Sequence, residues 1–367
     1  MIRVFDPHLR LEDLASVATA LQNGEISGNF GTSLERFEIG FSSYVGCAFG
    51  VATSSGTTAL HLALAAAGIG CGDEVIVSSS TNIATALAAV YLGAVPVPAD
   101  VKADSWNIDP DHVESLITSR TKAIIPVHLF GAAADMDRIM SIAERHDLLV
   151  VEDCAQAHGA RWNGRPVGSF GHMAAFSFYA NKAITTGEGG MVTSNDRQLA
   201  DRMRYLKNLA FTEPRFRHTD IGYNYRMAGY QAALGLEQLA RIENIIEAKR
   251  SLAYFYRNSL KGVEAIQWQA EPQEMRHVHW MAALNLRRDS KLKRDDLARV
   301  LYEKGIETRT FFCPMNQQPA LQALEGFPSD PCPVADRLWT SGLYLPSSLS
   351  LTDKDLSLIS DLVRDSL

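Results

Sequence analysis

Residues 50–97 decide the fold: GVATSSGTTALHLALAAAGIGCGDEVIVSSSTNIATALAAVYLGAVPV. Short apolar runs alternate here with longer segments whose apolar residues recur at helical spacing, which is typical of βαβ units. We predict, in order, a strand at 50–53, a helix at 57–67, a strand at 73–77, a helix at 82–91 and a strand at 95–97. Strands that are connected through helices run parallel in one sheet.

The same alternation continues between about residues 45 and 195. Further strands are predicted at 122–127, 148–151, 174–178 and 190–192, with a helix at 135–146. Residues 148–151 are apolar on both faces, as a buried parallel strand requires. The sequence therefore predicts an α/β fold, with a large domain whose mostly parallel sheet carries helices on both faces.

A smaller α+β unit is expected to follow this domain. Residues 229–260 keep a helical apolar period, long enough for one helix that connects two domains. Beyond it, strands are predicted at 280–286 and 306–312 and helices at 294–304 and 353–363. We place the boundary near residue 245, which gives a large domain at 1–245, including the N-terminal segment, and a small C-terminal domain at 246–367.

The composition is that of a globular protein and excludes several classes. The 367 residues are 46% hydrophobic and 21% charged, which excludes a disordered or collagen-like chain. The formal net charge of −7, without a long basic run, argues against a nucleic-acid partner. Five scattered cysteines show neither a disulfide framework nor a metal-binding spacing, and no stretch suits a signal peptide or a membrane span. We therefore expect a cytoplasmic protein that holds no metal and binds no membrane.

The first candidate site is TSSGTT at 53–58, between a predicted strand and a predicted helix. Backbone N–H groups at a helix N-terminus bind anions, and Gly56 lets a phosphate approach the backbone closely. The alternative is an ordinary helix N-cap, for which Ser and Thr are preferred. These residues taken alone favour the N-cap.

Two carboxylates, Glu152 and Asp153, follow the buried strand at 148–151. In open α/β sheets, ligands bind beyond the carboxyl ends of the strands. An acid at that edge can hold a metal or a ribose, or pair with a protonated ring nitrogen. A helix cap for the segment that follows is an equal alternative.

A third candidate is Lys182, which lies in the mostly small and apolar stretch FSFYANKAITTGEGG at 176–190. Desolvation lowers the pKa of a lysine and supplies the neutral amine that covalent chemistry at a carbonyl needs. Taken alone, a lysine that extends to solvent is the favoured alternative. The three candidates together meet the needs of pyridoxal 5′-phosphate (PLP): an anion site for its phosphate, a carboxylate for its ring nitrogen and an amine for its aldehyde.

The sequence resembles the DegT/DnrJ/EryC1/StrS family of PLP-dependent sugar aminotransferases. The resemblance runs along nearly the whole chain, and the motifs fit in order and in spacing. They are SSGTTALHLAL, GDEVIV, TKAIIPVHLFG, ADMDRI, VVEDCAQAHGA, VGSFG, FSFYANKAITTGEGG, GYNYRM, TRTFFCPMNQQP and GLYLPS. The resemblance implies the PLP-dependent transferase fold of type I, with a large sheet domain and a smaller C-terminal α+β domain.

The resemblance also implies a role for each residue of the cofactor site. Lys182 would bind PLP covalently and then move the proton, whereas Asp153 would pair with the ring nitrogen. Gln156 would lie near the phenolic oxygen of the ring. The residues implied to hold the phosphate are Ser55, Gly56, Thr57 and Ser177.

Two further positions belong to the implied cofactor site. Asn82 stands where the family usually has an aromatic residue that stacks on the ring, and its flat amide would give weaker stacking. Asn224, in GYNYRM, matches a residue that reaches the phosphate from the other subunit. A homodimer with shared active sites is therefore implied.

The implied reaction moves an amino group from an amino acid, expected to be L-glutamate, to a nucleotide-linked 4-keto-6-deoxysugar, with GDP-4-keto-6-deoxymannose favoured. Arginine can bind the pyrophosphate of such a substrate bidentately. The implied substrate-binding residues are Gly28, Asn29, Phe30, Arg215, Arg217, His218, Arg309 and Phe311, the last followed by Phe312. For Arg215 and Arg217, solvated surface charge is an equal alternative, and Arg217 also stands where related enzymes tend to carry an aromatic residue, so the sugar stays open.

Other activities remain as alternatives. A 3-keto sugar, or a sugar linked to UDP or dTDP, would need the same chemistry. A sugar dehydratase on this scaffold is disfavoured because such family members have histidine where this sequence has Lys182. A non-catalytic PLP-binding regulator is disfavoured by the intact set of cofactor residues.

Overall fold

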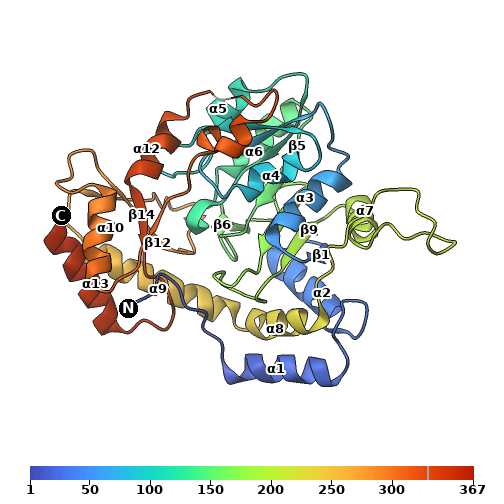
Figure 1. Cartoon of the computed structure of the whole chain (residues 1–367), viewed down its shortest axis with the longest axis horizontal. Helices are drawn as coiled ribbons and strands as arrows, with labels where there is room; N and C mark the ends of the chain where they lie inside the picture. The colour runs from blue at the N-terminus through green and yellow to red at the C-terminus, as the bar shows by residue number, and fades with distance from the viewer. Residues whose placement is uncertain (329) are drawn as a thin grey trace.

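The computed structural model describes residues 1–328 and 330–367, and its large unit is built on a seven-stranded sheet (Figure 1). The strand order is β1-β9-β8-β5-β4-β2-β3. The strands are β1 Phe49–Thr53, β2 Glu74–Ser78, β3 Val95–Ala99, β4 Thr121–Ile125, β5 Leu149–Asp153, β8 Met173–Ser177 and β9 Gly190–Ser194. In this sheet of the described chain, β9 runs antiparallel to both neighbours, whereas the other pairs are parallel. The predicted mostly parallel sheet is confirmed.

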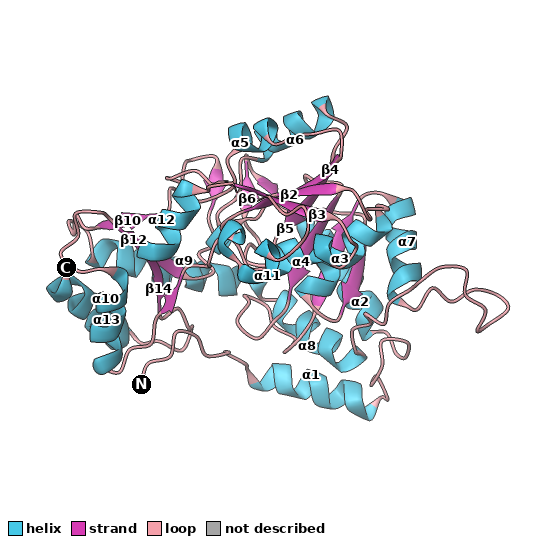
Figure 2. Cartoon of the chain, turned by 45° about the horizontal axis from the view of Figure 1, so that its top comes forward, coloured by secondary structure: helices cyan, strands magenta, loops and turns pink. Residues whose placement is uncertain are grey.

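Helices cover both faces of the sheet (Figure 2). One face carries α3 Gly56–Ala66, α4 Ala84–Val90 and α7 Arg197–Lys207, and the other carries α2 Ser33–Val45, α5 Pro110–Ser115, α6 Met136–Arg145 and α8 Gly229–Leu239. Successive side chains of a strand point to opposite faces. In β2, Val75 and Val77 accordingly pack in the core beneath α3 and α4, whereas Ile76 packs in the core beneath α6.

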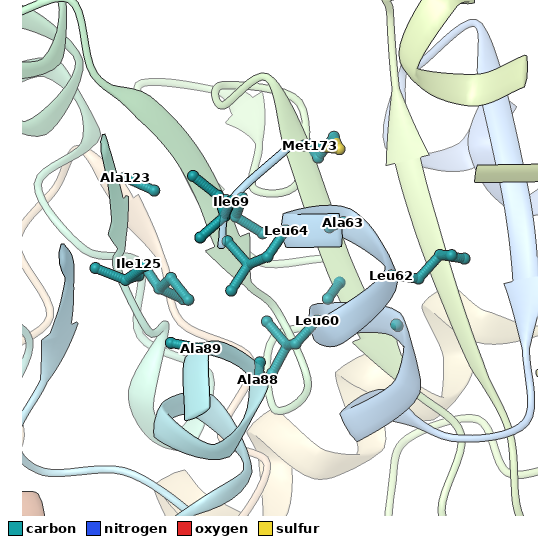
Figure 3. Close-up of a cluster of buried hydrophobic side chains, with 14 of the residues drawn as sticks. Leu60, Leu62, Ala63, Leu64, Ile69, Ala88, Ala89, Ala123, Ile125 and Met173 are labelled. Atoms are coloured by element: carbon teal, nitrogen blue, oxygen red, sulfur yellow. The ribbon is translucent and has the colours of Figure 1, made fainter. Parts of the chain in front are cut away.

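The core beneath α3 fixes the helix that matters most for the site. Figure 3 shows Leu60 of α3 directed toward Ala88 and Ala89 of α4, and Leu64 directed toward Ile69. Full burial of one leucine side chain stabilises a fold by about 1.5–3 kcal/mol. The N-terminus of α3 is therefore held firmly beside the carboxyl ends of the parallel strands.

The C-terminal unit has its own antiparallel sheet and core. The sheet has the order β10-β12-β14-β13. Its elements are β10 Ile266–Trp268, β12 Ala282–Leu286, β13 Arg309–Thr310, β14 Gly342–Leu345, α9 Ile242–Ser259, α10 Arg294–Glu303, α12 Pro333–Ser341 and α13 Asp353–Ser366. Ile2 pairs with Ile306, and Val4 packs in a cluster with Phe311. The first residues thus lie with the C-terminal unit, although the sequence assigned them to the large one.

Two sequence predictions are wrong in detail. The single helix expected at 229–260 is divided into α8 and α9, with the break at Ala240 and Arg241. Arg241 leaves helical geometry there and donates a 2.5 Å hydrogen bond to Asp13 of α1 (Leu11–Gln22). The strand expected at 306–312 is shortened to β13, in which Arg309 and Thr310 pair with Tyr344 and Leu343 of β14.

Short elements complete the described chain. They are β6 Arg161–Trp162, β7 Arg165–Pro166 and β11 Met275–Arg276, which form a small sheet, with η1 Leu129–Gly131, η2 Met315–Gln317 and α11 Pro319–Gln322. Across residues 1–328 and 330–367, none of the helices combines the length and the apolar character needed to span a membrane.

Candidate active site

A pocket of about 360 Å³ opens at the carboxyl edge of the large sheet. Loops that follow β1, β2, β5 and β8 supply most of its wall, because parallel strands end at the same edge. The pocket brings together eight of the predicted residues: Ser55, Gly56, Thr57, Asn82, Asp153, Gln156, Ser177 and Lys182. Trp280, Phe312 and Tyr344 come from the C-terminal part of the chain, so both units border the pocket.

The N-terminus of α3 forms one end of the pocket. Ser55 caps this helix and accepts a 3.1 Å hydrogen bond from the backbone N–H of Thr58. Gly56 follows and lies so close to β8 that an added Cβ would be 2.7 Å from Cβ of Ser177. Only glycine fits at this position without a shift, and the free N–H groups of the first turn favour an anion.

Asp153 ends β5 inside the pocket and is buried. Its carboxylate accepts a 2.8 Å hydrogen bond from the hydroxyl of Thr85 on α4 and a 3.1 Å bond from the N–H of Ala155. Burial raises the pKa of Asp153, while these hydrogen bonds and the positive charge of Lys182 oppose the rise. The site thus holds a desolvated carboxylate whose charge calls for a cationic partner.

Glu152 points away from this pocket and has a structural role. Its carboxylate accepts hydrogen bonds from the backbone N–H groups of Gly168, Phe170 and Gly171, and it lies 3.0 Å from Nε2 of His128. Ala134 donates its N–H to Nδ1 of His128, so the proton of this ring is on Nε2. Of the two carboxylates predicted at the strand end, only Asp153 is available to a ligand.

Lys182 lies in the loop between β8 and β9, with Nζ 4.4 Å from the centroid of the Trp280 ring. Burial lowers the pKa of Lys182 to about 8, and the negative charge of Asp153 acts in the opposite direction. A lysine with this pKa has a substantial neutral fraction near neutral pH. The amine can therefore act as a nucleophile or as a base.

The side chains of Asn82 and Gln156 are partly committed to the protein. Oδ1 of Asn82 accepts a 3.0 Å hydrogen bond from the N–H of Ala84 and so fixes the turn into α4. Oε1 of Gln156 accepts a 2.7 Å bond from the N–H of Phe130. Gln156 therefore offers its amide nitrogen, a donor, to a ligand in the pocket.

Several predicted residues lie outside this pocket in the chain. Asn224 is exposed, and its backbone pairs with that of Asn208. The exposed set also includes Asn29, Phe30, Arg215, Arg217, His218 and Arg309, and Arg309 forms a 2.6 Å ion pair with Glu307. Residues 215–218 belong to the loop that extends from α7 away from the body of the molecule (Figure 1).

Two of the predicted substrate residues pack against protein. Gly28 approaches the loop before α8 so closely that a Cβ would be 2.3 Å from the carbonyl oxygen of Met227. Phe311 is 1% exposed and packs against Trp106 and Phe130. The prediction for Phe311 is corrected: Phe312, its neighbour, lines the pocket, because the β13 register turns Phe311 into the core.

The sequence did not indicate Trp280, which lines the pocket, or Thr85, which donates a hydrogen bond to Asp153 from α4. A hydroxyl among the small apolar residues of α4 indicates that Thr85 is buried with a polar partner, but it does not identify that partner as Asp153. Trp280 begins the strand predicted at 280–286, and the sequence does not indicate that its ring contacts Lys182. Asn181, also in the pocket, has a buried Oδ1 without a hydrogen-bond partner in the described chain, which marks a place for a donor from a ligand.

The sequence profile of the DegT/DnrJ/EryC1/StrS aminotransferase family matches residues 7–364. The chain belongs to this family. The GDP-perosamine synthase of Caulobacter vibrioides is 42% identical over 89% of this chain and 88% of its own length. The dTDP-3-amino-3,4,6-trideoxy-alpha-D-glucose transaminase of Streptomyces venezuelae is 38% identical over 97% of this chain and 92% of its own.

A solved structure agrees with the fold and the cofactor. The PLP form of a putative sugar aminotransferase from Streptococcus pneumoniae superimposes with a TM-score of 0.91, at 26% identity, and covers 98% of this chain and 97% of that one. As a DegT/DnrJ/EryC1/StrS aminotransferase, the protein is a PLP-dependent sugar aminotransferase of fold type I, as the sequence had implied.

The residues in the pocket fit PLP. The absence of a side chain at Gly56 leaves room for a phosphate at the start of α3. Within residues 1–328 and 330–367, no cationic group forms an ion pair with the buried carboxylate of Asp153, and Lys182 supplies an amine in the same pocket. Ser55, Gly56, Thr57 and Ser177 would hold the phosphate. The donor chemistry of the pocket therefore matches the cofactor of the family.

Proposed function

We propose that the chain transfers the amino group of an amino acid, L-glutamate, to a nucleotide-linked 4-keto-6-deoxysugar, GDP-4-keto-6-deoxymannose. The observation that carries the proposal is the convergence of Lys182, Asp153 and the N-terminus of α3 in one pocket of a DegT/DnrJ/EryC1/StrS aminotransferase. The choice of sugar nucleotide rests on the similarity to GDP-perosamine synthase. Sugars linked to dTDP or UDP, and 3-keto sugars, are the alternatives.

Bound PLP supplies an electron-withdrawing ring that stabilises negative charge at the carbon next to the transferred nitrogen. The carboxylate of Asp153 would hold the ring nitrogen in its protonated form, and burial strengthens this interaction. Thr85 keeps Asp153 ionised and oriented through its 2.8 Å hydrogen bond. The first turn of α3 would hold the phosphate of the cofactor in the pocket that also contains Lys182.

Lys182 moves the proton. In its neutral form, Nζ accepts the α-proton of the amino donor, and in the second half of the reaction it donates a proton to the carbon of the sugar that receives nitrogen. Its pKa of about 8 supports both directions near neutral pH. Because the amino acid leaves as a keto acid before the sugar reacts, the kinetics should be ping-pong.

The proposal extends to a homodimer in which each protomer contributes to both sites. Asn224 and the arginines at 215 and 217 are exposed on the surface of the chain, where a second copy could use them. Mixing Lys182→Ala and Asn224→Ala protomers tests this sharing. Half of the random dimers would be mixed, and one of the two sites in each mixed dimer would be intact, so about a quarter of wild-type activity should return. Activity no greater than the sum of the parents would contradict shared sites.

We also propose that the chain divides into two domains near residue 245 and that the protein is cytoplasmic. The separate core built from Leu252 to Val363 supports the division. If it is correct, limited proteolysis should release fragments cut near the start of α9.

The substrate is tested by a single-turnover assay with the aminated form of the cofactor. The protein is loaded with pyridoxamine phosphate and offered GDP-, dTDP- and UDP-linked 4-keto and 3-keto sugars in parallel, with mass spectrometry of the products. We expect GDP-4-keto-6-deoxymannose to be aminated fastest. Faster amination of a dTDP- or UDP-linked sugar would replace the proposed substrate, and a deoxygenated product would indicate a dehydratase.

A further inference from the structure

Trp280 contacts the loop between β8 and β9, which carries Lys182, at two points. Its ring lies under Nζ of Lys182, 4.4 Å from the ring centroid, and its indole N–H donates a 2.7 Å hydrogen bond to the carbonyl oxygen of Asn181. Asn181 precedes Lys182 directly in the chain. One side chain thus holds both the amine of Lys182 and the backbone that carries it.

The position of Trp280 is itself fixed by the protein. Its backbone N–H donates a 2.9 Å hydrogen bond to the carbonyl oxygen of Phe130, and its ring stacks on that of Phe130 at an interplanar angle of 12°. Its carbonyl oxygen accepts a 3.2 Å bond from Nζ of Lys249 on α9, and Lys249 also donates to Ser347 after β14. The indole is therefore anchored to both units and is 5% exposed.

The ring of Trp280 is the contact that the structure shows for the amine of Lys182, within the described residues. Within residues 1–328 and 330–367, no carboxylate, carbonyl or hydroxyl oxygen accepts a hydrogen bond from Nζ of Lys182, and no ion pair reaches it. The negative charge of Asp153 favours the ammonium form of Lys182. A cation above an aromatic face gains about 0.5–2 kcal/mol, with the larger values at desolvated sites.

We propose that Trp280 is a positioning residue that holds the ammonium of Lys182 against its ring face and keeps the side chain directed into the pocket. The inference rests on the proposed role of Lys182 as the group that moves the proton. A ring face attracts the ammonium without accepting a hydrogen bond. The N–H protons of Nζ therefore remain available for transfer to carbon, which a carboxylate at the same place would restrict.

Fluorinated tryptophans placed at position 280 test the proposal. Added fluorine keeps the shape of the ring but removes negative potential from its face, so the attraction for a cation weakens stepwise. The readout is the apoprotein: an amine-selective acylating reagent is applied from pH 6 to 10, and the labelling of Lys182 is followed by peptide mass spectrometry. The pH midpoint reports deprotonation of Nζ without any need for cofactor or activity.

The wild-type midpoint is expected near 8 and should fall with each added fluorine. A total shift of about one unit corresponds to a tenfold change in the ratio of ammonium to amine. Trp268, whose ring lies beside Arg257, is the matched control: the same analogues there should leave the midpoint of Lys182 unchanged. Trp280→Phe keeps a ring but loses the hydrogen bond to Asn181, and we expect it to lower the activity of the holoenzyme more than the fluorinated proteins do.

A midpoint that stays constant across the fluorinated series overturns the inference and leaves Trp280 as a space-filling core residue. Because the analogues preserve shape, a folding defect in Trp280→Phe would not affect this test. The midpoint is measured in the apoprotein, so it does not depend on the sugar. An active transaminase with a constant midpoint would contradict the role of Trp280 alone, whereas a shifting midpoint in a protein that transfers no amino group would contradict the proposed function alone.

Discussion

Substitution of Gly56 by alanine perturbs the phosphate end of the site by a defined amount. The added Cβ would lie 2.7 Å from Cβ of Ser177, and an ordinary contact begins at 3.4 Å. The start of α3 and the end of β8 must therefore separate by at least 0.7 Å, the difference between these two distances. Ser177 cannot simply rotate away, because its Cβ is fixed by the backbone of the strand.

A separation of this size removes hydrogen bonds to a phosphate. A bond of about 2.9 Å that is lengthened by 0.7 Å no longer counts as a hydrogen bond. Loss of one charge-assisted bond costs about 1.5–3 kcal/mol, which corresponds to a roughly 10- to 150-fold weaker affinity for PLP. The stability of the apoprotein should change less, because the higher helix propensity of alanine offsets part of the overpacking.

The assay is a titration of apoprotein with PLP, followed by visible absorbance, alongside urea unfolding without cofactor. Gly70→Ala is the matched control, since a Cβ at residue 70 meets no atom within 4 Å. We expect Gly70→Ala to bind PLP as the wild type does. If Gly56→Ala binds PLP with wild-type affinity, then the N-terminus of α3 is not the phosphate site and the reasoning fails.

Three further predictions concern single contacts. Thr85→Val removes the hydroxyl that favours the ionised form of Asp153, so the pKa of this carboxyl should rise further. We expect kcat/KM near neutral pH to fall about tenfold and the acid limb of the pH profile to move to higher pH. An acid limb that does not move would contradict the role of Thr85. Arg241→Met leaves the buried carboxylate of Asp13 without its cation and should lower the free energy of unfolding by about 3–5 kcal/mol, measured in urea. A loss below about 1 kcal/mol would show that the Arg241–Asp13 pair does not stabilise the fold in this way. Burial lowers the pKa of Lys249 to about 7 from 10.5, so between these pH values the unfolded chain binds more protons than the folded one, and the free energy of unfolding should rise with pH. In Lys249→Met, this contribution to the pH dependence between pH 7 and 10 should disappear. An unchanged pH dependence would show that another group is responsible.

The cofactor site could be predicted from sequence because each of its parts is local. Strand ends, a helix start and a loop carry Asp153, Gly56 and Lys182, and topology alone brings these ends to one edge of the sheet. The functions of Thr85 and Trp280 depend on neighbours that are distant in the chain, and no local pattern encodes such contacts.

The errors have physical causes of the same kind. The apolar period at 229–260 is that of one helix, but Arg241 turns toward Asp13 of α1 and divides it. Which of Phe311 and Phe312 faces the pocket follows from the pairing of β13 with β14, and register cannot be read from two adjacent aromatic residues.

The central claim is that Lys182 moves the proton while nitrogen passes from an amino acid to a nucleotide sugar. The most direct measurement supplies the holoenzyme with ¹⁵N-glutamate and GDP-4-keto-6-deoxymannose and determines the mass of both products. We predict a sugar nucleotide that carries ¹⁵N, formed together with the keto acid of glutamate, in the wild type and in the surface control Lys354→Ala, but not in Lys182→Ala. An unlabelled sugar, or full labelling by Lys182→Ala, would contradict the account.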